Sequence, residues 1–183
     1  YKNGENLNIR ISLHEQYSQN KQGWFPWLLD QMDFDGARRI LEIGCGNGQL
    51  WKAADLSVLK GKYICLSDQS DGMIRDAAEN LGEEKASCFD FRTLDCQKLP
   101  FPDGEYDRMI ANHVLFYVQN LSRGLQEISR VLSEKGIFYC STYGKDHMKE
   151  ITELVQEFDP QINLSEVALS SIFGLEQGEK QLR

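Results

Sequence analysis

The sequence predicts an α/β protein, in which a mostly parallel sheet lies between two layers of helices. Short apolar runs that end at glycine or aspartate alternate along the chain with longer amphipathic segments. This alternation requires crossover connections, which give parallel strands and a three-layer α/β/α sandwich. With 183 residues, of which 41% are hydrophobic, the chain is long enough to bury one substantial core.

Five of the apolar runs are predicted to be strands. They are residues 38–44, 62–68, 86–95, 106–111 and 136–144. In a parallel sheet of this kind, ligands bind beyond the carboxyl ends of the strands, where the strand order reverses. The residues that follow the first four strands are therefore the candidates for a binding site.

Amphipathic patterns between these runs predict the helices. They cover residues 48–56, 70–82, 120–136 and 147–158. Ser70 is suited to cap the second of them and Gly82 to end it. In the third, leucine and isoleucine recur every three or four residues, which places them on one face of a helix. These residues are Leu121, Leu125, Ile128 and Leu132.

Three segments are expected along the chain. Residues 1–35 are predicted to form an N-terminal helical cap, 36–158 the sheet domain, and 159–183 a helical tail. The tail offers a helix start at Asn163 or Ser165 and an apolar stretch from Val167 to Phe173, but no pair of strands. We therefore expect a sheet of about five strands in a truncated chain, a fragment of a longer protein.

Charge and composition exclude several classes of function. The chain carries 20 Lys and Arg against 28 Asp and Glu, a net charge of −8, so a nucleic-acid partner is not expected. No apolar stretch approaches the roughly 20 residues that span a bilayer, and no secretory signal is visible, which predicts a cytoplasmic protein. The five cysteines are odd in number and form no C-x-x-C pair, so neither a disulfide framework nor a metal site is expected.

A glycine-rich loop follows the first predicted strand in "RRILEIGCGNGQLW". Gly44, Gly46 and Gly48 alternate there, whereas the dinucleotide fingerprint is G-x-G-x-x-G. Glycine allows tight turns and lets a ligand approach the main chain. The loop holds no basic residue to meet a phosphate, and Glu42 stands at the strand end. This arrangement favours a ligand with a positive end.

Further acidic residues follow the next two strands. Asp68 lies 24 residues after Gly44, where a carboxylate can accept hydrogen bonds from both hydroxyls of a ribose. Asp95 is placed to accept from the exocyclic amino group of a base, and Met73 and Leu99 to sandwich an adenine ring. A ligand with a ribose, an adenine, a positive end and no phosphate matches S-adenosylmethionine.

Several motifs together resemble class I, Rossmann-like S-adenosylmethionine-dependent methyltransferases of the small-molecule type. They are "LEIGCGNG", "CLSDQSDGMIRDA", "LDCQKLPFPDGEYD" and "ANHVLFYV", followed by "LQEISRVLSEKGIFYCSTYG", and they cover residues 36–145. Enzymes of that class end with two further strands, and we expect no such pair in residues 159–183. The resemblance implies a cofactor site made by Tyr17, Glu42, Gly44, Cys45, Gly46, Asp68, Gln69, Met73, Asp95, Cys96 and Asn112.

The resemblance also implies an acceptor site. His113 and Tyr117 are its candidate catalytic residues, since they follow the fourth strand, and Trp24 is expected to line it. The "ANHV" sequence lacks the Pro-Pro-aromatic motif of enzymes that methylate amino groups of nucleic acids. The expected function is methyl transfer to a small-molecule acceptor. A non-catalytic cofactor-binding module and, less favoured, an NAD-dependent oxidoreductase remain as alternatives.

Simpler interpretations stay open for individual residues. Asp95 is also suited to a turn, Met73 to ordinary packing between helix and sheet, and His113 to a structural hydrogen bond. The aromatic-rich opening segment is expected to be a helix that either covers the cofactor or buries Trp27 and Leu28 on the sheet. Finally, an uncovered sheet edge or the apolar tail is a possible homodimer contact.

Overall fold

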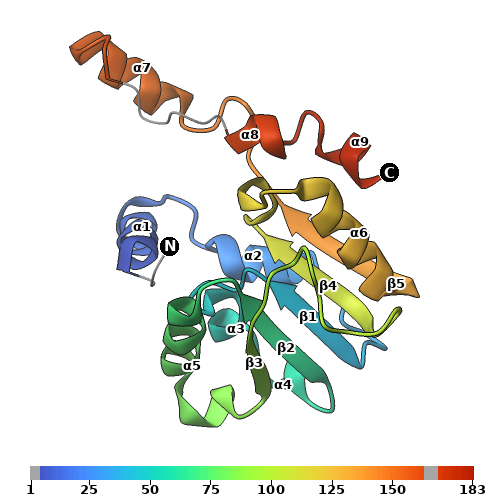
Figure 1. Ribbon diagram of the computed structural model, residues 1–183. Helices are drawn as coiled ribbons and strands as arrows, with labels where there is room; N and C mark the ends of the chain where they lie inside the picture. The colour runs from blue at the N-terminus through green and yellow to red at the C-terminus, as the bar shows by residue number, and fades with distance from the viewer. Residues whose placement is uncertain (1–4, 163–168) are drawn as a thin grey trace.

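The fold is a five-stranded sheet with helices on both faces (Figure 1). A computed structural model describes residues 5–162 and 169–183 of the chain. The strand order is β3-β2-β1-β4-β5, and every pair of neighbouring strands is parallel. The strands are β1 (Arg39–Ile43), β2 (Tyr63–Asp68), β3 (Phe89–Thr93), β4 (Tyr106–Asn112) and β5 (Leu132–Ser141). The predicted fold class is therefore confirmed.

The helices of the described residues form the outer layers and two peripheral segments. They are α1 (Glu5–Tyr17), α2 (Trp24–Asp30), α3 (Gln49–Ala53), α4 (Leu56–Leu59), α5 (Asp71–Ala86), the 3-10 helix η1 (Leu115–Tyr117), α6 (Leu121–Val131), α7 (Lys149–Phe158), α8 (Leu169–Ile172) and α9 (Gly178–Leu182). In Figure 1, α3 and α5 lie on one face of the sheet and α6 on the other, whereas α7 projects away from the body.

Two hydrophobic clusters fill the space between these layers. On β1, Ile40 belongs to the cluster under α3 and α5, whereas its neighbour Leu41 belongs to the cluster under α6. Successive side chains of a strand point to opposite faces, so one strand contributes to both clusters. Both residues are fully buried. The apolar runs of the sequence are thus central strands that are covered on both sides.

The strand order reverses between β1 and β4. Leu41 pairs with Cys65 of β2 on one side and with Met109 of β4 on the other. The chain leaves β1 and β4 in opposite directions there, which opens a crevice at the carboxyl ends of the strands. The glycine loop after Ile43 and His113 after β4 both lie at this end of the sheet.

Some element boundaries differ from those expected. The Ser70 side chain does cap α5, accepting from the amide of Met73, but the helix resumes after a break at Gly82 and continues to Ala86. The strand β3 ends at Thr93, before Asp95. Helix α6 ends at Val131, because β5 begins at once and bulges before it settles into register with β4.

The N-terminal segment forms two helices instead of the single one expected. Leu28 is buried on the α3 side of the sheet, as predicted for it, whereas Trp27 is 40% exposed, so its predicted burial is wrong. Trp27 does not reach the core because its ring packs on that of Trp24, with the ring centroids 5.2 Å apart. Within the described residues, no helix is both long and apolar enough to span a membrane.

The C-terminal tail packs on the domain. Phe173 is 1% exposed within the cluster under α6, and the amide of Leu175 donates to the carbonyl of Tyr143, just beyond β5. Helix α8 contacts η1. Asn163, Ser165 and Val167 lie outside the described residues. Along the rest of β5, the free edge of the sheet pairs with no further strand among the described residues.

Candidate active site

The glycine loop between β1 and α3 has a backbone that side chains would not tolerate. Gly44, Gly46 and Gly48 all have positive φ angles, of 68°, 55° and 79°. A Cβ atom at Gly44 would lie 2.4 Å from Cγ2 of Val114. The φ angles favour glycine at all three positions, since L residues disfavour this region of φ, and at Gly44 a side chain would also overlap with Val114.

The carboxylate of Asp68 holds this loop in place. Its Oδ2 accepts from the amide of Gly46 at 3.0 Å, and its Oδ1 accepts from the amide of Ser70 at 2.9 Å. One side chain at the end of β2 thus fixes both the glycine loop and the start of α5. Asp68 is only partly buried, and a carboxylate has about four acceptor positions, so capacity remains for a ligand.

Glu42 is buried directly beneath the loop. It is 2% exposed, and its Oε2 accepts from the indole Nε1 of Trp51 at 2.6 Å. Burial raises the pKa of Glu42 to about 8, with a further contribution from the negative charge of Asp68, although the hydrogen bond from Trp51 opposes the rise. A cation placed beside Glu42 would favour the ionised carboxylate and offset its burial.

A small cavity of about 50 Å³ opens on the other side of the loop. It brings together Gly44, Gln69, Asp95, Cys96 and Tyr117, five of the predicted site residues from four separate segments. The other residues that line it are Ile43, Leu94, Gln97, Val118 and Gln119. The predicted adenine sandwich is not part of its wall, since Met73 and Leu99 are buried elsewhere, at 3% and 4% exposure.

Two residues of this cavity have a clear local role. Asp95 forms a turn, because its Oδ1 accepts from the amide of Gln97 at 2.9 Å, so the turn interpretation of Asp95 is correct. This carboxylate is nevertheless exposed at the cavity. Cys96 is 8% exposed, and burial raises the pKa of its thiol to about 11, which keeps it protonated at neutral pH. The same holds for Cys45, whose thiol pKa is raised by burial.

On the acceptor side, three residues join the ends of β4 and β5. The Oγ of Ser141 donates to the side-chain oxygen of Asn112, and the amide of His113 donates to the carbonyl of Ser141 at 3.2 Å. His113 has a φ of 53°, an unusual value for a residue other than glycine. Backbone strain of this kind gathers at functional sites, because the surrounding structure must enforce it.

His113 stands in the middle of a column of five aromatic rings. Its ring lies 5.1 Å from that of Trp24 and 4.5 Å from that of Tyr143, measured between centroids. Trp27 extends the column beyond Trp24, and His147 extends it beyond Tyr143. We call these rings (Trp27, Trp24, His113, Tyr143 and His147) the aromatic column. It connects α2 to the segments that follow β4 and β5.

The imidazole of His113 is chemically distinctive. Its Nδ1 is buried and has no hydrogen-bond partner among the described residues. Burial lowers its pKa to about 4, and the neighbouring His147 adds to the effect, so the ring is neutral at pH 7. A neutral imidazole has one nitrogen that accepts a hydrogen bond. The simpler prediction of a satisfied structural histidine does not fit an unpartnered Nδ1.

The remaining predicted residues lie near the periphery. Tyr17 ends α1 and is 70% exposed, and Tyr117 is 49% exposed. Helix α1 is nonetheless tied to the glycine loop, because Nδ2 of Asn47 donates to Oδ1 of Asn8 at 2.6 Å. Sequence reasoning missed Ser141, Tyr143 and His147. A signal for Ser141 and Tyr143 was available in "STYG", which begins at the last residue of β5, the strand that pairs with β4, whereas His147 had no such signal.

The matched family agrees with this site. Residues 41–140 match the methyltransferase domain family, which covers more than half of the chain. The chain therefore belongs to that family, and the predicted resemblance to class I S-adenosylmethionine-dependent methyltransferases is confirmed.

Individual relatives extend the comparison. The chain is 32% identical over 114 residues to a malonyl-acyl-carrier-protein O-methyltransferase of Legionella pneumophila, covering 62% of this chain and 39% of that protein. The cyclase SpnF is 30% identical, with a TM-score of 0.54, over 62% of this chain and 42% of its own. A methyltransferase from Thermotoga maritima, described as a possible histamine N-methyltransferase, covers 98% of this chain and 76% of its own, with 16% identity and a TM-score of 0.66.

These matches differ in what they establish. At 16% identity the Thermotoga protein supports the fold alone. The chain spans between 39% and 52% of the length of the first curated relatives that it matches. The family match over residues 41–140 extends from β1 into β5 and includes the glycine loop.

Proposed function

We propose that this chain binds S-adenosylmethionine at the carboxyl ends of β1, β2 and β4 and transfers its methyl group to a small-molecule acceptor. The Asp68 carboxylate carries this proposal, because it holds the amide of Gly46 and keeps acceptor capacity for ribose hydroxyls. The buried Glu42 adds to it, since its raised pKa makes it a carboxylate that a ligand ammonium group would ionise. A phosphate has no comparable partner, because residues 42–48 include no basic side chain.

Each predicted residue has a place in such a complex. The main chain from Gly44 to Gly46 would follow the methionine part, with the Cys45 amide between the two glycines and Glu42 directed to the amino group. Asp68 and Gln69 would bind the ribose. Asp95 and the Cys96 amide would contact the polar edge of adenine, whereas Met73 would act only from behind the site, as a packing residue of α5. Asn112 would lie near the sulfonium, and Tyr17 would cover the site from α1.

Methyl transfer from a sulfonium requires the protein mainly to align the acceptor with the methyl group and to exclude water from the site. When bound, S-adenosylmethionine supplies an electrophilic methyl group on a sulfonium, and S-adenosylhomocysteine remains after the transfer. The aromatic column and Tyr117 would orient the acceptor and exclude water, which favours in-line attack. The neutral ring of His113 would help to orient the acceptor together with Trp24 and Tyr143, and a carboxylate acceptor, which is already ionised at neutral pH, would need no base.

The nature of the acceptor rests on less direct support. Malonyl-acyl-carrier-protein O-methyltransferases recur among the relatives. A malonyl thioester is therefore the first acceptor to test. The fold does not decide the reaction, since a cyclase shares it and the chain spans only part of its curated relatives. A non-catalytic cofactor-binding module is thus the alternative that the experiment must address.

Calorimetry with S-adenosylmethionine and S-adenosylhomocysteine tests the cofactor, with NAD as the control ligand. We expect both sulfur compounds to bind and NAD not to bind. Asp68→Ala should weaken binding about 100-fold, because it removes charged hydrogen bonds to two hydroxyls. The exposed Glu79→Ala on α5 is the matched control and should bind as the wild type does. Equal affinity in Asp68→Ala would refute the ribose assignment.

Methyl transfer is tested separately. Release of S-adenosylhomocysteine is measured with malonyl-coenzyme A as the acceptor. Product formation that His113→Gln reduces, with unchanged S-adenosylmethionine affinity, would support the acceptor assignment. Cofactor binding without transfer to a panel of oxygen, nitrogen and carbon nucleophiles would favour the non-catalytic module.

A further inference from the structure

The segment that follows β3 is held against α6 by hydrogen bonds from side chains. After β3 the chain runs through residues 94–105 before β4 begins. This 94–105 segment carries Asp95 and Cys96, which line the small cavity beside the glycine loop. The position of these two residues therefore depends on what fixes the segment to the rest of the molecule.

Gln97 joins the segment to the start of α6. Its amide donates to Oδ1 of Asp95 at 2.9 Å, and its side-chain Nε2 lies 3.0 and 3.2 Å from the two carboxylate oxygens of Asp95. Its Oε1 accepts from the amide of Asn120, the cap residue of α6, at 2.9 Å. Its carbonyl accepts from Nε of Arg123 at 3.3 Å. Gln97 thus connects the Asp95 carboxylate to a helix of the outer layer.

These contacts occupy only part of the Asp95 carboxylate. A carboxylate offers about four acceptor positions, and Gln97 uses two on Oδ1 and one on Oδ2. Asp95 is exposed at the cavity, so the remaining position can accept from a ligand. Because Gln97 holds the carboxylate before a ligand arrives, less side-chain freedom is lost when the ligand binds.

A second anchor lies farther along α6. Glu127 is 5% exposed, and its Oε2 accepts from the amide of Leu99 at 3.0 Å. Arg130 donates to the carbonyl of Leu99 at 3.0 Å and to that of Phe101 at 2.8 Å. Its guanidinium also donates to both carboxylate oxygens of Glu127, at 2.8 and 3.1 Å, and a bidentate pair of this kind fixes the geometry. The chain that follows Gln97 is therefore fixed to α6 as well.

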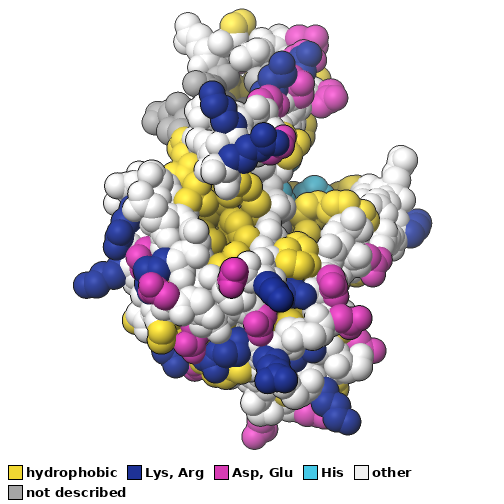
Figure 2. Space-filling view, turned by 90° about the vertical axis from the view of Figure 1, so that its right-hand side faces the viewer, with side chains coloured by type: hydrophobic (Ala, Val, Ile, Leu, Met, Phe, Trp, Pro, Cys, Tyr) yellow, Lys and Arg dark blue, Asp and Glu magenta, His cyan; other side chains and the backbone are white. Residues whose placement is uncertain are grey.

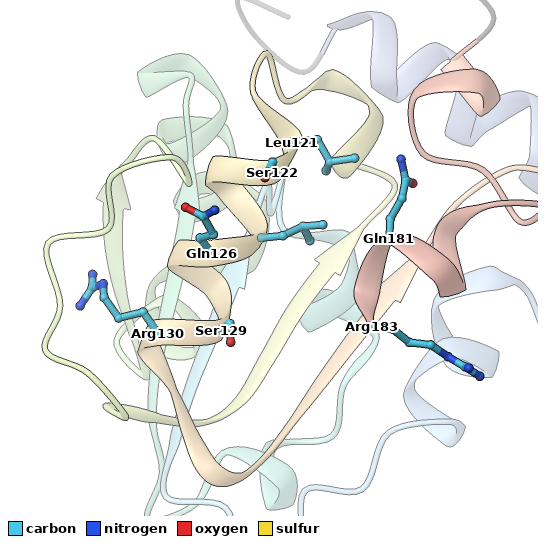
Figure 3. Close-up of a pocket in the computed structure, with 8 residues that line it drawn as sticks. Leu121, Ser122, Gln126, Ser129, Arg130, Gln181 and Arg183 are labelled. Carbon is cyan, nitrogen blue, oxygen red and sulfur yellow. The ribbon is translucent and has the colours of Figure 1, made fainter.

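The arginines of α6 serve contacts within the chain. Figure 2 shows the side of the molecule where α6 lies in Figure 1, and Lys and Arg side chains are interspersed there with Asp and Glu. Arg123 pairs with Glu127 at 3.3 Å, and Arg130 pairs with Asp103 at 2.8 Å. In Figure 3, Arg130 points away from the pocket between α6 and α9, and its guanidinium binds the 94–105 segment instead. The charges of both arginines thus help to hold that segment.

We propose that Gln97 is a positioning residue that sets which base the cofactor site accepts. It fixes the Asp95 carboxylate, so that this group accepts from the 6-amino group of adenine and disfavours a base with an oxygen at that position. An oxygen there cannot donate, and the carboxylate beside it would be repelled and left without its partner. This role rests on the proposed function, since it assumes that the small cavity receives the adenine of S-adenosylmethionine.

Calorimetry with S-adenosylhomocysteine and S-inosylhomocysteine tests this role, because the second compound carries an oxygen in place of the 6-amino group. We expect the wild type to bind the adenosyl compound about 30-fold more tightly. Gln97→Ala should reduce this preference to about 3-fold, because Asp95 is then free to turn away. Gln97→Met, which keeps the length of the side chain but cannot donate, should behave in the same way. The exposed neighbour gives the matched control, Lys98→Ala, which should keep the full preference.

A double substitution separates positioning from direct contact with the base. Asp95→Ala should also show a preference of about 3-fold, and adding Gln97→Ala to it should change nothing further. A further loss in the double variant, or Gln97 variants that weaken both compounds equally, would overturn the proposal. Urea denaturation checks that each variant is folded.

The wild type by itself distinguishes this inference from the proposed function. Equal binding of the two compounds would refute the base selectivity and leave the cofactor assignment intact. If neither compound binds, the proposed function fails, and the role of Gln97 fails with it.

Discussion

The adjacent strands β4 and β5 differ in how completely their side chains are buried. Met109, Ile110 and Ala111 of β4 are fully buried, whereas their partners in β5, from Phe138 to Cys140, are only partly covered. Beyond β5 comes α7, which has no buried residue. The part of the molecule that carries the glycine loop is therefore closely packed, whereas β5 and α7 are only partly buried.

The largest effect on the free energy of unfolding is expected at the glycine loop, in the closely packed part of the molecule. Gly44→Ala should lower the free energy of unfolding by about 4 kcal/mol, because a left-handed backbone and an overlap with Val114 add together. Gly61→Ala is the control, with a similar φ of 73° and no atom within 4 Å of the added Cβ. It should cost about 1 kcal/mol in urea denaturation. Equal losses of stability in the two variants would mean that the Val114 side chain can move away from the added Cβ at little cost.

The next largest effect concerns the buried carboxylate of Glu42 and the dependence of stability on pH. The pKa of Glu42 is raised from 4.5 to about 8, so the folded protein holds this proton more tightly than the unfolded chain. Stability from this group is complete below pH 4.5 and is lost as the pH rises through 8, by about 3 kcal/mol. Glu42→Gln should remove that loss when urea denaturation is compared at pH 5 and pH 8, whereas the exposed Glu79→Gln should not.

A matched pair of substitutions tests the contrast between the strands directly. Ile110→Ala in β4 should cost about 3 kcal/mol, since the residue is fully buried. Ile137→Ala in β5, where 38% of the residue is exposed, should cost about 1 kcal/mol. The difference of about 2 kcal/mol in thermal or urea unfolding measures how incomplete the β5 side is. Similar costs would show that β5 is as well supported as β4.

The smallest effect on stability is expected at His113, which directly follows β4. Its pKa is lowered from 6.5 to about 4, so stability from this group is present above pH 6.5 and is lost as the pH falls through 4. Because the ring is partly exposed, we expect about 1 kcal/mol. His113→Gln should lose less stability than the wild type between pH 7 and pH 4.5, and His14→Gln, on the exposed face of α1, should behave as the wild type does. An identical loss in all three proteins would argue against a buried neutral imidazole.

Much of the fold was predictable because its signals are local. The strand that ends at Ile43, the cap at Ser70 and the carboxylate at Asp68 can each be identified from a few neighbouring residues. Boundaries were less predictable where two elements adjoin without a turn signal. At Leu132 the register with β4 overrides the helical pattern, and the strand starts inside the expected helix.

The sequence by itself determined the fold class, the glycine loop and the family, because glycine, aspartate and apolar periodicity act within a short stretch of chain. Only the tertiary structure decided what stands around His113, since Trp24, Tyr143 and His147 reach it from separate elements. It also decided that the Asp68 carboxylate accepts a hydrogen bond from the Gly46 amide. Such contacts join residues far apart in the chain, and their energies depend on packing that local sequence does not encode.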